Sequence, residues 1–171
     1  HLRECGAATV LGGEYEQSLV DLAARLALGQ NGVQPEPLVS LRRQQFLVPD
    51  RSGLPDLSGY GRIVGGGTAK RVGYTEASRG CKHLCRHCPI VPVYNGAFRV
   101  VQRQVVLEDI RRQVAAGAEH VTFGDPDFFN APSHALAILE GLHVEFPALT
   151  YDVTIKIEHL LKHRDLLAPL K

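Results

Sequence analysis

The sequence predicts an α/β fold in two parts: the end of a doubly wound, Rossmann-like domain, followed by the first half of a partial β/α barrel. The first observation is an apolar run at residues 7–11 that leads through Gly12-Gly13 into a helical repeat ending at Gly29. The second is a later series in which strand and helix patterns alternate, at residues 72–77, 107–114, 120–123, 133–143 and 150–157. Such alternation is typical of parallel βαβ units.

The elements of the second part each have their own signal. In the helix at 107–114 the apolar residues share one face, and Gly117 ends the repeat. We expect Ser133 to cap the following helix, because a serine hydroxyl accepts hydrogen bonds from the free amides of a first turn. The segment at 150–157 alternates and is rich in β-branched residues, which predicts a strand along its whole length.

The chain is expected to divide into three regions. Residues 1–29 form the C-terminal edge of the first domain, residues 30–71 a linker, and residues 72–171 the N-terminal part of a truncated barrel. Prolines and glycines in the linker exclude a long regular element, while Phe46 and Tyr60 indicate that it docks on a neighbouring surface. We expect the chain to be a fragment, because it lacks methionine and stops inside an apolar, helix-like run.

Composition narrows the class of protein. Hydrophobic residues make up 44% of the chain and charged residues 22%, which is ordinary globular usage and excludes disorder of the whole chain. The net charge of +1 gives no field that would draw the protein to nucleic acid or to an acidic membrane. The sequence shows neither an apolar run of membrane-spanning length nor a signal-peptide pattern, so we expect a cytoplasmic protein.

The strongest chemical signal is the loop that holds Cys81, Cys85 and Cys88 at CxxxCxxC spacing directly after a predicted strand. Iron–sulfur clusters are held by thiolates, normally four for each cluster. Three thiolates on a four-iron cluster leave one iron free to bind another molecule. The nearby Lys82 and Arg86 favour the deprotonated, ligating form of the cysteines.

Other interpretations of the loop remain open at this stage. A zinc ion bound by the three cysteines and by His83 or His87 is one alternative, although structural zinc sites usually use two separated ligand pairs. A disulfide is disfavoured in a cytoplasmic chain. A cluster that only transfers electrons, without catalysis, is the remaining alternative.

Residues 78–88 resemble the cluster loop of the radical S-adenosylmethionine (radical SAM) enzymes, whose pattern is CxxxCx(aromatic)C, with His87 at the aromatic position. The Arg79-Gly80 lead-in and the α/β units resemble the subgroup with a cobalamin-binding-type domain ahead of the barrel. Residues 12–16 resemble the end of that domain, and residues 46–50 its connector. Within the subgroup, the chain looks like the radical SAM proteins named for a Cys-Sec/Cys-Ala-Glu-Pro (CUAEP/CCAEP) tail.

The resemblance implies a set of cofactors and residue roles. Cys81, Cys85 and Cys88 match the ligands of a [4Fe-4S] cluster, whose open iron holds S-adenosylmethionine. His87 matches the position that meets the adenine. The segment that follows the second barrel strand matches the one that contacts the methionine amino group, although it replaces the family's Gly-Gly-Glu and also reads as a simple turn; its residues are Gly124, Asp125, Pro126 and Asp127. Cobalamin is a further cofactor that the resemblance implies as a hypothesis.

The implied activity is reductive cleavage of S-adenosylmethionine to a 5′-deoxyadenosyl radical, which removes a hydrogen atom from a substrate. The substrate, a small molecule or a peptide, is not named by the sequence. The implied electron donor is a flavodoxin or a ferredoxin. No membrane and no nucleic acid are expected as partners.

Weaker candidates are assigned ordinary roles. Glu14 and Glu16 are interpreted as solvated charges at a helix start. Lys156 and Glu158, at the end of the predicted third strand, would lie on the active face of a barrel or form a surface ion pair. The remaining groups are interpreted as surface or interface histidines and as a solvated basic helix face; they are His134, His143, His159, His163, Arg99, Arg103, Arg111 and Arg112.

Overall fold

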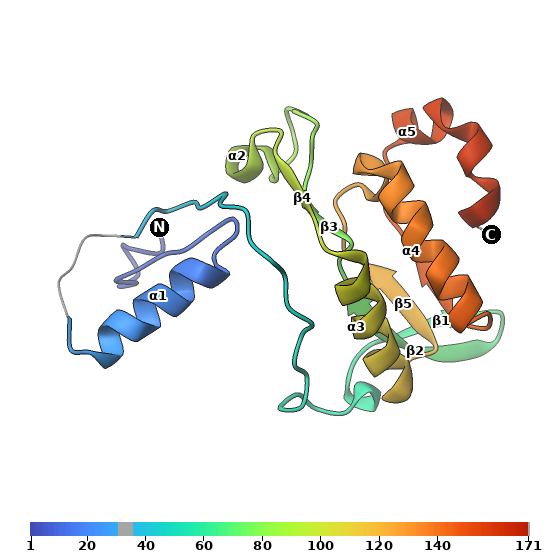
Figure 1. Cartoon of the computed structure of the whole chain (residues 1–171), viewed down its shortest axis with the longest axis horizontal. Coiled ribbons are helices and arrows are strands. Elements are labelled where there is room, and N and C mark those ends of the chain that lie inside the picture. Colours follow the sequence, from blue (N-terminus) through green and yellow to red (C-terminus); the bar gives the residue numbers. More distant parts are fainter. Residues whose placement is uncertain (31–35, 171) are drawn as a thin grey trace.

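A computed structural model describes residues 1–30 and 36–170 of the chain. Its centre is a four-stranded sheet with the strand order β1-β2-β5-β6 (Figure 1). β2, β5 and β6 run parallel, and β1 pairs with β2 in the antiparallel direction. The strands are β1 (Arg62–Gly65), β2 (Thr68–Thr75), β5 (His120–Phe123) and β6 (Thr150–Asp152). The predicted parallel βαβ order is therefore present.

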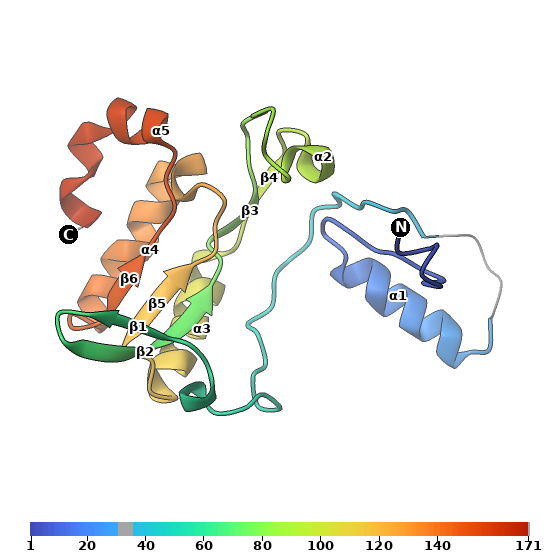
Figure 2. The same ribbon diagram turned by 180° about the vertical axis from the view of Figure 1, so that it is seen from behind.

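Two helices, α3 (Arg103–Ala115) and α4 (Pro132–Glu145), connect successive parallel strands and cover one face of the sheet. Figure 2 shows the strands in front of these helices, so the other face of the sheet is turned to the viewer. The core lies between helices and sheet, because their apolar stripes bury surface only against each other. Its most deeply buried members include Val106, Ile110, Val121, Phe123, Ile138 and Leu142.

The hairpin of β1 and β2 begins inside the region predicted to be a linker. Gly65 pairs with Thr68, so two residues form the turn, and both of them, Gly66 and Gly67, have positive φ values of 57° and 79°. A two-residue turn with positive φ at both positions matches the twist of a hairpin and strongly favours glycine. The glycines that the sequence analysis took as a sign of irregular chain therefore build a regular element.

The cysteine loop is held in a small unit of its own above the sheet (Figure 1). β3 (Ser78–Gly80) and β4 (Phe98–Val100) form a separate antiparallel pair, and the short helix α2 (Val91–Tyr94) lies between them in sequence. Because β3 follows β2 after two residues, this unit stands at the carboxyl end of the parallel strands. Ligand-binding loops of parallel α/β sheets lie at this end.

The N-terminal part consists of α1 (Glu16–Ala27) and irregular chain, and lies to one side of the sheet (Figure 1). The predicted helix is confirmed, but the strand predicted at residues 7–11 is wrong. In the described residues of this part, the strand-like contact is a single parallel bridge between Gly13 and Ser40. A strand needs a partner along its length, and one bridge does not supply it.

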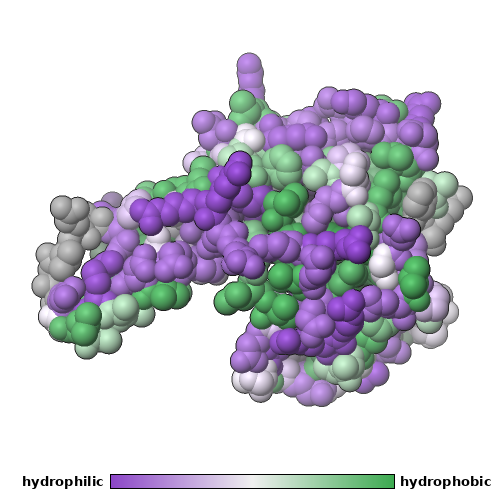
Figure 3. Space-filling view, viewed as in Figure 1, coloured by the Kyte–Doolittle hydropathy of each residue, from purple (hydrophilic) through white to green (hydrophobic). Residues whose placement is uncertain are grey.

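An extended segment leads from this part to the sheet and forms a 3₁₀ turn at Leu57–Gly59. The predicted docking of the segment holds for Phe46, which is partly buried against the core. Leu54 and Tyr60 are 56% and 46% exposed. The space-filling view in Figure 3 shows how the N-terminal part projects from the body. α1 also leaves large hydrophobic side chains exposed, among them Leu19, Val20 and Leu26.

The C-terminal segment differs from the prediction in two respects. β6 ends at Asp152, because the chain then leaves the sheet and enters α5 (Ile157–Lys162), followed by 3₁₀ turns at Arg164–Leu166 and Ala168–Leu170. Ser133 does not cap α4. The helix starts one residue earlier at Pro132, whose fixed φ and missing N–H suit a first helical position, and the N-cap residue is Ala131.

None of the helices in the described part of the chain is both long enough and apolar enough to cross a membrane.

The position of the core generates a prediction on α4. Ile138 is completely buried, whereas Val144 on the same helix is 79% exposed. Replacing Ile138 by Ala should lower the free energy of unfolding by about 2–5 kcal/mol, because the removed methyl groups leave a cavity. Val144→Ala should change it by less than about 0.5 kcal/mol. Denaturant unfolding measures both, and equal effects would contradict the assignment of the core.

Candidate cofactor site

The three loop cysteines stand beyond a tight turn that glycine makes possible. Gly80, the last residue of β3, has a φ of +72°, and a Cβ at this position would lie 2.6 Å from the carbonyl oxygen of Ala97 and 2.4 Å from a ring carbon of Tyr94. Only glycine adopts this conformation with so little space. All three cysteines are free thiols of intermediate exposure; they are Cys81, Cys85 and Cys88. They are therefore accessible to a bound group.

A buried amide anchors the start of the loop. The side chain of Asn130, which is 4% exposed, accepts a hydrogen bond from the backbone amide of Lys82 (3.3 Å) and donates one to the carbonyl oxygen of Gly80 (3.3 Å). The Cys81 thiol lies 3.6 Å from the same Asn130 oxygen, and the Lys82 ammonium donates to the Asn130 carbonyl at 3.1 Å. Asn130 thus fixes the backbone on both sides of the first cysteine. No sequence pattern signals this role, because Asn130 meets the loop across 48 positions of the chain.

A buried carboxylate anchors the strand below the loop. The two oxygens of Asp125 accept hydrogen bonds from the Ala77 amide (2.9 Å) and the Ser78 hydroxyl (2.6 Å). Burial raises the pKa of Asp125 above its ordinary value, against the opposing effect of these hydrogen bonds. Asp125 was predicted to contact the cofactor; its carboxylate is turned to β3.

The other predicted cofactor residues are arranged as follows. Gly124 and Pro126 are of intermediate exposure, Asp127 is buried, and His87 is exposed. The Tyr74 phenol packs beside Gly124, in the space that a Cβ would occupy. The segment therefore presents its backbone rather than its carboxylates at the end of β5.

His83, a member of the cysteine loop, is turned toward a buried group. Its Nε2 lies 3.1 Å from Nε2 of His159 and 3.6 Å from Oδ2 of Asp127. Its Nδ1 lies 3.2 Å from the Lys156 ammonium. Burial and the positive charge of Lys156 lower the pKa of His83.

This geometry bears on the zinc alternative. Thiolate sulfurs around one zinc ion, with Zn–S bonds of about 2.3 Å, lie roughly 3.8 Å apart. Among the His, Cys, Asp and Glu side chains of the described residues, one group has ligand atoms that all lie within 4.8 Å of one another. This group consists of His83, Asp127 and His159. The three cysteines do not form such a group, so at least one pair of their sulfurs lies more than 4.8 Å apart.

Two of the weaker assignments are wrong. Glu14 is 1% exposed rather than solvated, and it accepts hydrogen bonds from Tyr94 (3.0 Å) and Gln44 (3.0 Å). Burial and the hydrogen bond to Glu14 raise the pKa of Tyr94. His159 is 4% exposed and belongs to the buried group around His83, so it is not an ordinary surface histidine.

The assignment of Arg99 to a solvated helix face is wrong as well, because Arg99 lies on β4, is partly buried and donates to the carbonyl oxygens of Leu41 (2.6 Å) and Phe98 (2.9 Å). Other assignments agree with the structure. Lys156 and Glu158 form a partly exposed ion pair of 2.7 Å. Arg111 and Arg112 form exposed ion pairs with Glu108, which is what a solvated helix face predicts. His134 is half-buried, and a ring nitrogen lies 3.3 Å from the Ala77 carbonyl oxygen.

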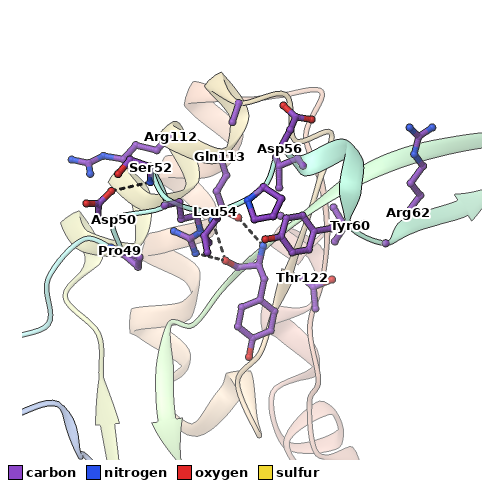
Figure 4. Close-up of a pocket in the computed structure, with 18 of the residues that line it drawn as sticks. Pro49, Asp50, Ser52, Leu54, Asp56, Tyr60, Arg62, Arg112, Gln113 and Thr122 are labelled. Carbon is purple, nitrogen blue, oxygen red and sulfur yellow. Dashed lines mark hydrogen bonds between the residues drawn. The ribbon is translucent and has the colours of Figure 1, made fainter. Parts of the chain in front are cut away.

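A cavity of about 890 Å³ lies on another part of the molecule, between the extended segment, α3 and the edge of β2 (Figure 4). Leu54 and Tyr60 line it, together with Gln113, whose side chain pairs with both backbone groups of Tyr74. Arg51 also donates to the Tyr74 carbonyl oxygen, at 3.0 Å. These side chains close the free edge of β2. Within the described residues, the cavity lining includes none of the three loop cysteines.

The chain is similar to parts of known proteins. It is 38% identical over 71 residues to ribosomal protein uS12 methylthiotransferase RimO of Syntrophotalea carbinolica, a match that covers 40% of this chain and 15% of that protein. No family model matches the chain.

The structure is similar to that of TsrM, a radical S-adenosylmethionine methyltransferase of Kitasatospora setae. One TsrM structure, with cobalamin and a [4Fe-4S] cluster bound, gives a TM-score of 0.62 at 16% identity. Another, with its tryptophan substrate and the S-adenosylmethionine analogue aza-SAM bound, gives 0.65 at 19% identity. Each match covers 94% of this chain and 35% of TsrM, so the chain spans about a third of that protein.

These findings define the class of fold. The chain shares the fold of about a third of TsrM, a radical SAM methyltransferase whose structure holds cobalamin, and the predicted resemblance to radical SAM enzymes with a cobalamin-binding-type domain is confirmed at the level of the fold. The expected mixed α/β architecture is also confirmed at the level of the fold class.

The anchoring of the loop generates a second prediction. Asn130→Ala removes the hydrogen bonds to Lys82 and Gly80 and should cost about 1–3 kcal/mol of stability, because their buried partners are left unsatisfied. The loop should then hold less iron and sulfide after anaerobic reconstitution of the intact protein. Gln104→Ala, which removes an exposed amide on α3, is the control. Equal iron content in the two variants would show that Asn130 does not anchor the loop.

Proposed function

We propose that the protein is a radical SAM enzyme that holds a [4Fe-4S] cluster through Cys81, Cys85 and Cys88 and reductively cleaves S-adenosylmethionine. The observation that carries the proposal is a loop with three free, accessible thiols at the carboxyl end of a parallel sheet. The confirmed likeness of the fold to a radical SAM methyltransferase supports it.

The donor set suits a four-iron cluster. Thiolates are the ordinary ligands of such clusters, and three of them leave one iron for a further ligand. At least one pair of their sulfurs lies more than 4.8 Å apart, farther than two thiolates on a single zinc ion, and His83 is engaged with other residues. When bound, the cluster supplies an electron and an iron coordination position to S-adenosylmethionine, which yields methionine and a 5′-deoxyadenosyl radical that removes a hydrogen atom from the substrate.

The residues of this chain position the reacting groups and hold charge. The Gly80 turn and the Asn130 amide fix the first cysteine in place. The Lys82 ammonium, which donates to the Asn130 carbonyl oxygen at 3.1 Å, places positive charge on the same loop. Because catalysis by a bound cofactor depends on its orientation, these contacts are the contribution of the protein.

We propose further that the end of β5 receives the methionine part of S-adenosylmethionine. The carboxylates of Asp125 and Asp127 are buried, whereas Gly124 and Pro126 are partly exposed. The backbone carbonyls of this turn are therefore the proposed acceptors for the ammonium group. His87, exposed between two of the cysteines, is the proposed contact of the adenine.

We include the domain boundaries of the chain and the binding partners of the protein in the same proposal. Residues 1–29 would be the edge of a cobalamin-binding-like domain, residues 30–71 the connector, and residues 72–171 the first half of the barrel. Cobalamin, a flavodoxin or ferredoxin as electron donor, and a cytoplasmic location follow from the resemblance to radical SAM enzymes. The substrate class, a small molecule or a peptide, is left to experiment.

The proposal predicts a specific response to loss of single cysteines. In the intact protein, reconstituted anaerobically, we expect about four irons and four sulfides per chain and release of 5′-deoxyadenosine after reduction with S-adenosylmethionine. Cys85→Ala should abolish both, because two remaining thiolates do not hold the cluster. Cys5→Ala, at an exposed free cysteine outside the loop, should change neither.

Two outcomes would contradict the proposal. One bound zinc per chain without iron would indicate a structural zinc module. A full cluster that never releases 5′-deoxyadenosine would indicate an electron-transfer module.

A further inference from the structure

A second group of metal-binding side chains lies beside the cysteine loop. His83 belongs to the loop, Asp127 to the turn after β5, and His159 to α5. The loop, the turn and α5 meet at the same end of the sheet (Figure 1). Residues separated by 44 and 32 positions in the sequence therefore face one point.

The separations match those of ligands around one ion. Nε2 of His83 lies 3.1 Å from Nε2 of His159 and 3.6 Å from Oδ2 of Asp127. Donor atoms bound to one tetrahedral zinc ion at about 2.0–2.2 Å lie roughly 3.3–3.6 Å apart. In His159, Nε2 is the nitrogen near His83 and Nδ1 is the nitrogen 2.9 Å from Asp127, and one ligand atom from each of the three residues lies within 4.8 Å of the other two. Binding of all three residues to one ion therefore requires a shift of the His159 side chain.

The burial of the group leaves two polar atoms without ordinary partners. Asp127 is 2% exposed and His159 is 4% exposed. Oδ2 of Asp127 and Nδ1 of His159 are 2.9 Å apart, but their orientation is not that of a hydrogen bond, so neither has a hydrogen-bond partner among the described residues. The other oxygen of Asp127 accepts from the backbone amides of Phe129 and Lys156. A buried carboxylate with one unpaired oxygen is costly unless a cation or a donor reaches it.

We propose that His83, Asp127 and a ring nitrogen of His159 bind one divalent first-row transition metal ion, of the class of zinc or ferrous iron. Two imidazoles and one carboxylate are the ligands of open zinc sites and of non-haem ferrous sites. The ion is separate from the iron–sulfur cluster of the proposed function. It clamps the cysteine loop to the turn after β5 and to α5.

Lys156 competes with the ion for His83. Its ammonium lies 3.2 Å from Nδ1 of His83, which accepts this hydrogen bond only while Nε2 carries the ring proton. A metal ion at Nε2 places the ring proton on Nδ1, so Lys156 must turn away, and its ion pair with Glu158 supplies the alternative partner. Lys156→Gln should therefore bind the ion at least as tightly as the unchanged protein.

The test measures zinc and iron together in the intact protein after cluster reconstitution, incubation with Zn²⁺ and buffer exchange. We expect one zinc per chain in addition to the cluster iron. His159→Gln should lose the zinc and keep the iron. His163→Ala is the control, because its ring lies 6.0 Å from that of His159 and outside the ligand group; it should keep both metals.

Cobalt gives a readout that does not depend on the folding of the His159 variant. In an intact protein with Cys81, Cys85 and Cys88 replaced by Ser, bound Co²⁺ should show visible absorption without thiolate charge-transfer bands. The proposal would be overturned if proteins that retain His159 failed to bind Zn²⁺ or Co²⁺ stoichiometrically. It would also be overturned if His159→Gln retained its zinc. Loss of the cluster with zinc retained by the His83 group would contradict the proposed function and not this site.

Discussion

The proposed function depends on one constraint: the three sulfur donors of an irregular loop must face one cluster without regular secondary structure to hold them. The neighbouring elements supply the order that the loop lacks. Asn130 holds the backbone around Cys81, and Asp125 holds β3 through Ala77 and Ser78. Both anchors come from the segment that follows β5, so the parallel pairing of β2 with β5 sets the position of the loop.

The N-terminal part is coupled to the same loop by a second network. Tyr94 packs against Gly80 and donates a hydrogen bond to the buried Glu14. Arg79, next to Gly80, forms an ion pair with Glu16 and lies over the ring of Phe46 at 4.9 Å. Burial alone lowers the pKa of an arginine, but hydrogen bonds to Glu16 and Glu76 outweigh it and raise that of Arg79, which keeps its charge. Movement of the N-terminal part would thus be transmitted to the first cysteine.

Sequence patterns correctly predicted the helices and strands that are determined by the spacing of nearby apolar residues. The helix at α3 and the strand at β5 follow from apolar spacing, and the cysteine spacing indicated a candidate metal or cluster site. The hairpin at Gly66-Gly67 was missed because two glycines are equally typical of an irregular segment and of a two-residue turn. Only the pairing of β1 with β2 distinguishes these two structures. β6 was predicted too long because residues 153–156 keep a strand-like composition after the chain has left the sheet.

The residues that support the site could not be predicted, because they come together only in the folded chain. Asn130 meets the loop 48 positions away from Lys82, and His159 meets His83 across 76 positions. Glu14 was interpreted as a solvated charge because it lies at a helix start, yet its partners Gln44 and Tyr94 come from later segments. Spacing reveals ligands on one loop, whereas a set of ligands drawn from three segments leaves no pattern in the sequence.

The central claim is that the three cysteines leave one iron of a cluster free to bind S-adenosylmethionine. The most direct measurement is electron–nuclear double resonance on the reduced, intact protein with S-adenosylmethionine carrying ¹⁵N in its amino group. The account predicts a ¹⁵N coupling to the cluster that disappears when unlabelled cofactor is used. A reduced cluster without such a coupling, under conditions in which the cofactor is bound, would contradict it.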